Sequence, residues 1–204
     1  MDKRDLAREL KGLYLPHKER FVLVEVPELS FLMVDGTGSP EASPAFQEAI
    51  GALYSVAYTL KFASKKEQGL DWKVMPLEGL FWTDDEGRLA LDGKGNWNWT
   101  LLLLQPEFVT SEDVARAIAA AGKKQPLPGS RKLRRESFTE GPSVQTLYLG
   151  AYADEGPTIE RMHAFITEQG YEPRGKHHEI YLGDPRRTAP ERLRTVIRQP
   201  VRRA

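Results

Sequence analysis

The spacing of apolar residues along this chain changes from a strand pattern to a helix pattern and back, in the same order twice. Each half begins with a run rich in β-branched and aromatic residues, whose alternate side chains would face opposite sides of a sheet. A segment with apolar residues at helical spacing follows, and two further strand-like runs complete the half. This order predicts an α+β fold made of two β-α-β-β units.

The first predicted unit covers about residues 21–122. Its first strand is interrupted by Pro27, which has no N–H to donate and therefore predicts a bulge or a bend. Ser43 and Pro44 mark the start of a helix, because serine caps free amides and proline suits the first turn. The other predicted elements are strands over 72–82 and 97–105 and a helix over 111–121 that ends at Gly122.

The second predicted unit covers about residues 141–201. It comprises strands over 143–152, 176–182 and 193–199, and a helix over 157–169. Residues 122–141 are rich in lysine, arginine, proline and glycine, which is typical of a linker. The predicted organisation is thus a charged lead-in over residues 1–20 and one domain over residues 21–201.

Composition excludes several classes of function. Lysine plus arginine equals aspartate plus glutamate at 29 each, so no net charge attracts nucleic acid or an anionic membrane. The chain has no cysteine, which excludes disulfides, thiolate metal sites and cysteine nucleophiles. Because the polar N-terminus lacks the apolar core of a signal peptide, we expect a cytoplasmic protein. We expect no cofactor, no membrane and no direct nucleic-acid partner, and a monomer or a homodimer.

One predicted strand combines a carboxylate with core residues. The period of two places His177, Glu179 and Tyr181 on one face and Ile180 and Leu182 on the other. The two aliphatic side chains should face the core. Glu179 therefore points to the opposite side, where an apolar setting would favour cation binding or general-base chemistry.

Aromatic side chains gather on one face of other predicted elements. Trp97 and Trp99 share a face of one strand, and Thr146, Tyr148 and Tyr152 share a face of another, opposite Leu147 and Leu149. Tyr54 and Tyr58 form a second stripe on the first long helix. The leucines suit the layer under a helix and the tyrosines a partly wet face. Aromatic rings bind flat ligands by area and stacking, although tyrosine and tryptophan are also common half-buried strand residues.

Other candidate sites are weaker. His177 and His178 are adjacent, so in a strand they point to opposite faces and cannot chelate one metal ion together. His163 has no partner at metal-ligand spacing. Arg131, Lys132, Arg134 and Arg135 form a basic cluster without interleaved aromatics, which favours a solvated linker over nucleic-acid contact.

Several stretches of sequence carry a resemblance to a known family. The segment 179–191, which reads EIYLGDPRRTAPE, and the segment 195–201, TVIRQPV, resemble the C-terminal signature of GyrI-like small-molecule-binding proteins. WNWT at 97–100 with Gln105-Pro106, and LGAY at 149–152 with Glu155-Gly-Pro157, resemble the single-domain branch of that family. The resemblance runs from about Phe21 to Val201.

This resemblance implies two β-α-β-β units related by a pseudo-twofold axis, with a ligand groove between them. It implies that Glu179 lies in the groove and engages ligands, and that Tyr152 matches a family tyrosine. The stand-alone branch is similar to proteins that hydrolyse the cyclopropane ring of DNA-alkylating natural products of the yatakemycin class. On that basis Glu179 is the expected general base, with Tyr152 or Tyr148 donating a hydrogen bond. Trp97, Trp99, Tyr54 and Tyr58 are expected to stack on the ligand, with Tyr181 nearby.

Three functions remain open at this point. The first is a hydrolase that detoxifies strained, electrophilic aromatic compounds. The second is a non-catalytic multidrug binder or sensor for lipophilic cations, and the third is a gyrase-inhibitor-like interaction protein. The sequence does not separate the first two, because both need a carboxylate among aromatic rings.

Overall fold

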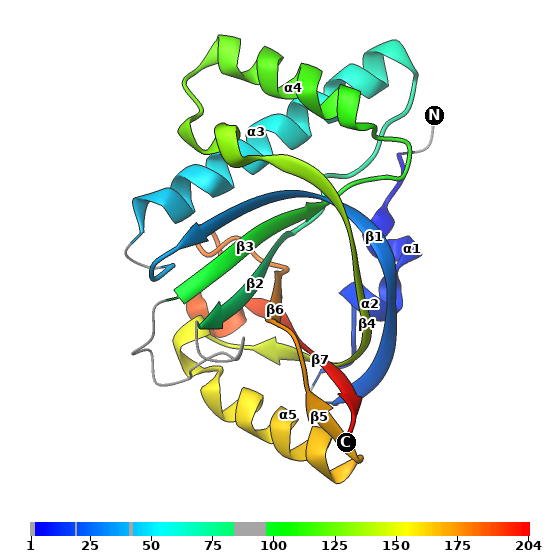
Figure 1. Ribbon diagram of the computed structural model, residues 1–204, viewed down its shortest axis with the longest axis vertical. Coiled ribbons are helices and arrows are strands. Elements are labelled where there is room, and N and C mark those ends of the chain that lie inside the picture. The colour runs from blue at the N-terminus through cyan, green and yellow to red at the C-terminus, as the bar shows by residue number, and fades with distance from the viewer. Residues whose placement is uncertain (1–2, 19, 41–42, 84–96) are drawn as a thin grey trace.

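The structure, a computed structural model, describes residues 3–18, 20–40, 43–83 and 97–204 (Figure 1). Helices and strands confirm the α+β class. The strands are β1 (Val22–Thr37), β2 (Leu77–Thr83), β3 (Trp97–Leu104), β4 (Arg134–Leu149), β5 (Tyr171–Pro173), β6 (His177–Tyr181) and β7 (Arg194–Arg203). The helices are α1 (Leu6–Glu9), α2 (Lys11–Tyr14), α3 (Pro44–Glu67), α4 (Ser111–Lys124) and α5 (Gly156–Glu168), with 3-10 turns η1 (Pro128–Lys132), η2 (Tyr152–Asp154) and η3 (Pro190–Arg192).

The main sheet closes on itself. Its strands are hydrogen-bonded in the order β4-β1-β3-β2-β6-β7, and β7 pairs with β4 to complete the ring. Every pairing between these strands is antiparallel. The short β5 pairs with the C-terminal end of β7, also antiparallel. In Figure 1, α3 and α4 lie on one side of the closed sheet and α5 lies on the opposite side. The predicted pseudo-twofold relation between the two halves stays a prediction.

Three apolar clusters follow from this closure. The first lies between the outer face of β1 and β3 and the helices α3 and α4, and contains Leu53, Trp99 and Leu101. The second includes Leu102, Ile180 and Val196 from the opposite faces of the strands, together with Leu13 and Tyr14 of α2. The third joins α5 to β4 and β7 through Val144, Met162 and Ile197. The sheet therefore has an inner face closed by α1 and α2 and an outer face covered by the long helices.

The predicted interruption at Pro27 is not a bulge, because β1 runs through the proline, and Figure 1 shows β1 as a curved strand. Val26 pairs with Gly141 and Glu28 pairs with Thr139, so the register is the same on both sides of the proline. Gly141 has φ of +74°, a conformation that glycine adopts without steric cost. This glycine pairs with Val26, the residue before the proline, within the long ladder between β1 and β4.

The linker predicted over residues 122–141 is wrong. Gly122 lies inside α4, which continues to Lys124, and β4 begins at Arg134. A single glycine costs a helix only about 1 kcal/mol, so the packing of α4 overrides it. Two arginines of the basic cluster have structural partners: Arg134 Nη1 lies 2.7 Å from Asp35 Oδ2, and Arg135 Nε donates to the Val109 carbonyl over 2.8 Å.

The faces of β4 are also the reverse of the expectation. Leu147 packs against the inner cluster, whereas Tyr148 packs against the cluster beneath α5. The helix therefore covers the tyrosine face. The closed sheet explains the difference for Leu147, since it provides an apolar interior, whereas Leu149 is 39% exposed. No helix within the described ranges has both the length and the apolar character needed to cross a bilayer.

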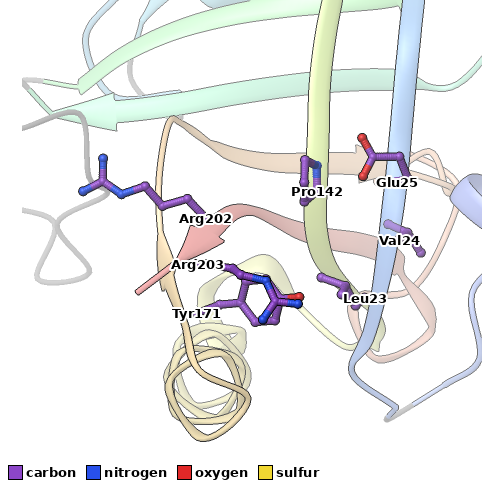
Figure 2. Close-up of a pocket in the computed structure, with 7 residues that line it drawn as sticks. All are labelled: Leu23, Val24, Glu25, Pro142, Tyr171, Arg202 and Arg203. Carbon is purple, nitrogen blue, oxygen red and sulfur yellow. The ribbon is translucent and has the colours of Figure 1, made fainter.

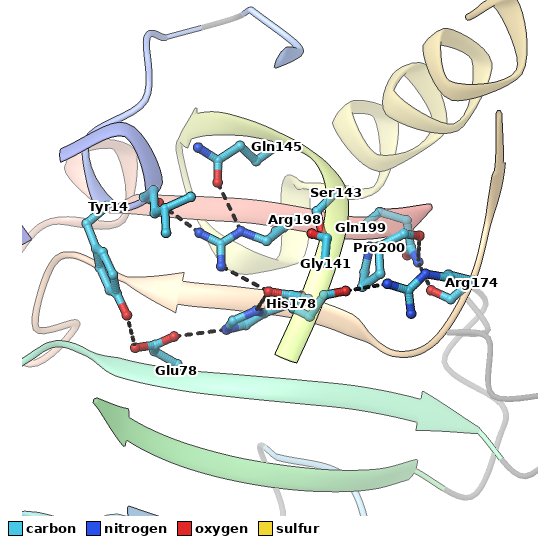
Figure 3. Close-up of polar contacts among 12 residues, drawn as sticks. Tyr14, Glu78, Gly141, Ser143, Gln145, Arg174, His178, Arg198, Gln199 and Pro200 are labelled. Atoms are coloured by element: carbon cyan, nitrogen blue, oxygen red, sulfur yellow. Dashed lines mark hydrogen bonds and ion pairs between the residues drawn. The ribbon is translucent and has the colours of Figure 1, made fainter. Parts of the chain in front are cut away.

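The inner face holds a buried network of charged groups (Figure 3). His178 Nε2 lies 3.1 Å from Glu78 Oε2, and His178 Nδ1 lies 3.0 Å from Glu140 Oε1. Arg198 Nη1 donates to Glu140 Oε2 over 3.0 Å, and the Tyr14 hydroxyl donates to Glu78 over 2.7 Å. All five residues are at most 2% exposed. Two carboxylates then face two cations, provided that the imidazole of His178 is protonated.

The same network fastens the N-terminal helices to the sheet. Arg198 Nη2 donates to the Leu13 carbonyl over 2.8 Å, and Gln145 Nε2 donates to the Gly12 carbonyl over 2.7 Å. These bonds satisfy carbonyls near the end of α2, which would otherwise lack partners. The predicted lead-in over residues 1–20 is thus tied to β4 and β7.

We expect the network to make stability depend on pH. Burial alone would lower the pKa of His178, but its contacts with Glu140 and Glu78 raise that pKa to about 9. Protonated His178 therefore stabilises the fold fully below its unfolded pKa of about 6.5, and this contribution disappears as pH rises through 9. The free energy of unfolding should fall by roughly 3 kcal/mol between these values, at 1.36 kcal/mol per pKa unit. Urea denaturation at several pH values measures it.

The matched control is His178→Gln, which cannot carry the charge. This variant should be less stable at pH 6 and should lose most of the slope between pH 6.5 and 9. A wild-type protein whose urea midpoint stays constant over that interval would contradict a protonated His178.

Candidate functional site

The outer face of β6 carries the predicted carboxylate. His178 and Ile180 point to the inner face, so Glu179 and Tyr181 point outward, as the strand period predicts. Glu179 pairs across the sheet with Gly79 on β2 and with Ile197 on β7. Despite its position on the outer face, it is only 7% exposed, because side chains from several elements surround it.

Glu179 is held as a carboxylate by its neighbours. Burial alone would raise its pKa, but contact with His177, whose Nε2 lies 3.2 Å from Glu179 Oε1, opposes that effect. Hydrogen bonds with the side chains of Glu155 and Tyr181 also lower the pKa. Together with His177 they keep the pKa of Glu179 below its ordinary value. The group is therefore ionised at neutral pH.

Glu155 is the partner that sequence reasoning missed. It immediately precedes α5, and its side chain does not cap the helix but hydrogen-bonds Glu179. Burial and then the charge of Glu179 raise the pKa of Glu155 to about 10, so it is protonated and donates the bond. The only signal in the sequence was its place in the Glu155-Gly-Pro157 stretch, which identified the family but gave this residue no role.

Two tyrosines lie beside the carboxyl pair. Tyr181 hydrogen-bonds Glu179, and its ring meets the ring of Tyr152 edge to face with centroids 5.3 Å apart. Burial, followed by the charge of Glu179, raises the pKa of Tyr152 to about 12 and that of Tyr181 well above its usual value. Both phenols are therefore protonated near neutral pH and able to donate hydrogen bonds. The structure thus brings Glu179, Tyr152 and Tyr181 together.

The predicted stripe on α3 lies at the edge of the first apolar cluster. Tyr54 is half-buried, and both Tyr54 and Tyr181 pack against that cluster. Tyr58 is 47% exposed, and its ring lies 6.4 Å from Tyr54 and 6.3 Å from Phe62. The stripe therefore runs from the cluster outward to solvent. Phe62, which is 61% exposed, extends it and was not predicted.

The two predicted tryptophans occupy different positions. Trp99 is 1% exposed and meets Phe46 edge to face at 5.0 Å. Its ring also covers Gly36, where a Cβ atom would lie 2.1 Å from the indole. Trp97 is half-buried and meets Phe81 edge to face at 6.1 Å. Trp99 is thus a core residue, a position that does not suit stacking on a ligand, whereas Trp97 lies at the edge of the cluster.

Tyr148 has a local structural role. Its hydroxyl donates to the Ala151 carbonyl over 3.0 Å and lies against Gly150, where a Cβ atom would be 2.4 Å from it. This bond holds the turn that leads from β4 to Tyr152 and Glu155. Tyr148 therefore shapes the site from one side.

Other positions offer less chemistry. Within the described ranges, no three histidine or acidic side chains are grouped so that they could hold a metal ion. A hollow of about 330 Å³ lies between β1, β4, β5 and β7 (Figure 2). Its lining residues are Leu23, Val24, Glu25, Pro142, Tyr171, Arg202 and Arg203, and none of them belongs to the group around Glu179.

Known proteins resemble this chain in sequence and in fold. Residues 100–202 match the GyrI-like small molecule binding domain. A crystal structure of a conserved protein from Listeria innocua is 38% identical, with a TM-score of 0.90, over 98% of this chain and 100% of that one. The chain belongs to the GyrI-like family. Glu179, Tyr152 and Tyr181 all lie in the GyrI-like match.

Other solved structures share this fold. A protein from Listeria innocua described as a hydrolase is 37% identical, with a TM-score of 0.85, over 98% of this chain and 100% of that one. The C-terminal domain of EcmrR is 11% identical with a TM-score of 0.56 over 91% of this chain and 98% of that domain, so it shows the fold alone. A comparison with curated proteins gave no match.

Proposed function

We propose that this GyrI-like protein binds flat, hydrophobic small molecules at Glu179 and hydrolyses strained, electrophilic aromatic compounds of the cyclopropanoid class. The observation that carries the proposal is a buried but ionised carboxylate surrounded by protonated phenols. The description of a 37% identical relative as a hydrolase supports the enzymatic assignment. The family match supports a small-molecule ligand.

The proposed reaction adds water to a cyclopropane that is spiro-fused to a dienone. The water oxygen bonds to the ring methylene, and the electrons of the broken C–C bond convert the dienone into a phenolate. Glu179 takes a proton from the attacking water. Since the pKa of Glu179 is low, the base is available at neutral pH, although its hydrogen bonds also reduce its strength.

The phenols supply the second half of the mechanism. Negative charge develops on the dienone oxygen, and a donor aimed at that oxygen lowers the barrier more than it stabilises the substrate. We assign this donor role to Tyr152, because Tyr181 already hydrogen-bonds Glu179. Trp97, Tyr54 and Tyr58 are the proposed stacking surface, whereas Trp99 and Tyr148 support it from the core and the turn.

Ring opening of a cyclopropanoid analogue, followed by absorbance, tests the proposal. We expect the protein to accelerate ring opening over buffer through many turnovers. A parallel binding titration with a rhodamine dye distinguishes the hydrolase from the alternative function, a non-catalytic binder of lipophilic cations. Dye binding without any acceleration of ring opening would contradict the hydrolase and leave that binder.

A further inference from the structure

Glu155 is a carboxylic acid that the reaction proposed above does not use. In that reaction the leaving group is a phenolate, which is stable at neutral pH and needs no proton donor. Glu155 is nevertheless part of the site through its hydrogen bond with Glu179. Its Oε2 atom is buried without a protein partner. The site thus holds one more acid than cyclopropanoid hydrolysis requires.

We propose that Glu155 acts as an acid on the leaving oxygen and Glu179 as a base on the attacking water, so that this site also hydrolyses aryl epoxides. An acid and a base that hydrogen-bond each other can serve only atoms that lie close together. In a cyclopropane fused to a dienone, a whole ring system separates the attacking water from the oxygen that becomes charged. In an epoxide only the attacked carbon separates the attacking water from the leaving oxygen.

The atoms balance without any further reactant. The water oxygen bonds to an epoxide carbon while the bond from that carbon to the ring oxygen breaks. Glu179 receives the proton of the water, and Glu155 gives its proton to the leaving oxygen, which yields a diol. Glu179 is then protonated and Glu155 ionised, and transfer of one proton along their hydrogen bond restores the starting state.

The acid strength of Glu155 suits this leaving group. An alkoxide is far more basic than a carboxylate whose pKa is about 10, so the proton moves downhill from Glu155. After the transfer, the negative charge lies at the N-terminal end of α5. The helix dipole stabilises an anion at that position. A phenolate is much less basic than an alkoxide, so protonation by Glu155 would assist its departure much less.

The surroundings keep the two carboxyl groups in these different states. On β6, His177 and Tyr181 both contact Glu179, which favours its ionised form. Tyr152 lies within the field of both carboxylic groups and is itself neutral, and Asp184, which also acts on Tyr152, is paired with Arg186. The charged and titratable neighbours thus favour one proton shared by the pair, carried by Glu155.

The test uses the whole protein and an aryl epoxide such as trans-stilbene oxide, with diol formation measured by chromatography. We expect diol formation above the buffer rate, and a decrease of about 100-fold or more in both Glu155→Gln and Glu179→Gln, given the usual size of general acid–base effects. Glu160→Gln is the matched control, because Glu160 is an exposed residue on the same helix. It should form diol at the wild-type rate.

A second measurement does not depend on how the variants fold. The wild-type rate should be constant around neutral pH and should fall above about pH 10, where Glu155 loses its proton. Spontaneous attack by hydroxide rises over the same range. No diol above the buffer rate, an unchanged rate in Glu155→Gln, or a rate that increases above pH 10 would each overturn the inference. The proposed cyclopropanoid hydrolysis is tested with a different substrate, so failure of the epoxide assay and failure of the cyclopropanoid assay can be told apart.

Discussion

Glu179→Gln is expected to slow opening of a cyclopropanoid ring by about 100-fold or more, because general-base catalysis usually contributes 10²–10⁴-fold. Glutamine has nearly the same shape but no negative charge and no basic oxygen of comparable strength. The variant keeps Tyr152 and the aromatic surface of α3, so a neutral flat ligand should bind with similar affinity. The loss should therefore appear in kcat and not in KM.

The comparison is made by absorbance under saturating substrate, with circular dichroism as a check on folding. Glu160→Gln is again the control, since it removes one exposed carboxylate from α5. If Glu179→Gln retained wild-type kcat, the base would have to be another group. If only binding of cationic ligands fell, Glu179 would serve as a counter-charge.

Arg198→Met is expected to lower the free energy of unfolding by about 3–5 kcal/mol, the usual cost of breaking a buried ion pair from one side. The guanidinium is 2% exposed, and it donates to Glu140, Gln145 and the Leu13 carbonyl. Methionine fills part of the volume but leaves those three acceptors with fewer donors. The pKa of Glu140, which burial would raise but His178 and Arg198 lower to about 2, should then rise.

The same substitution elsewhere on β7 provides the control. Arg202 pairs with Glu172, but its side chain is 67% exposed. Exposed pairs usually contribute about 0–1 kcal/mol, so Arg202→Met should change the urea midpoint little. Equal losses of stability in the two variants would contradict a stabilising role for the buried network.

Local sequence patterns predicted the parts of the fold that depend on neighbouring residues. The strand period correctly separated Glu179 and Tyr181 from Ile180, and Ser43 and Pro44 correctly marked the start of α3. The helix predicted over residues 111–121 is confirmed as α4, which Thr110 and Asp113 begin with a capping box. These features arise within a few residues, so a single sequence contains the information.

The remaining features depend on contacts between distant segments. Closure of the sheet rests on the pairing of β4 with β7, whose residues are about fifty positions apart, and no local period encodes it. The buried network joins Glu78, Glu140 and Arg198 for the same reason. Glu155 was missed because its chemistry comes from contact with Glu179, and a glutamate before a helix is otherwise an ordinary residue.

The central claim is that the site catalyses hydrolysis, and the fate of the substrate in ¹⁸O-labelled water tests it most directly. Excess cyclopropanoid analogue is incubated with the protein, and the molecular masses of the product and of the protein are both measured by mass spectrometry. We predict many molecules of ring-opened phenol per protein, each carrying one ¹⁸O atom from water, and a protein of unchanged mass. Consumption of a single equivalent with a covalent adduct on the protein, or no ring opening at all, would contradict hydrolysis at Glu179.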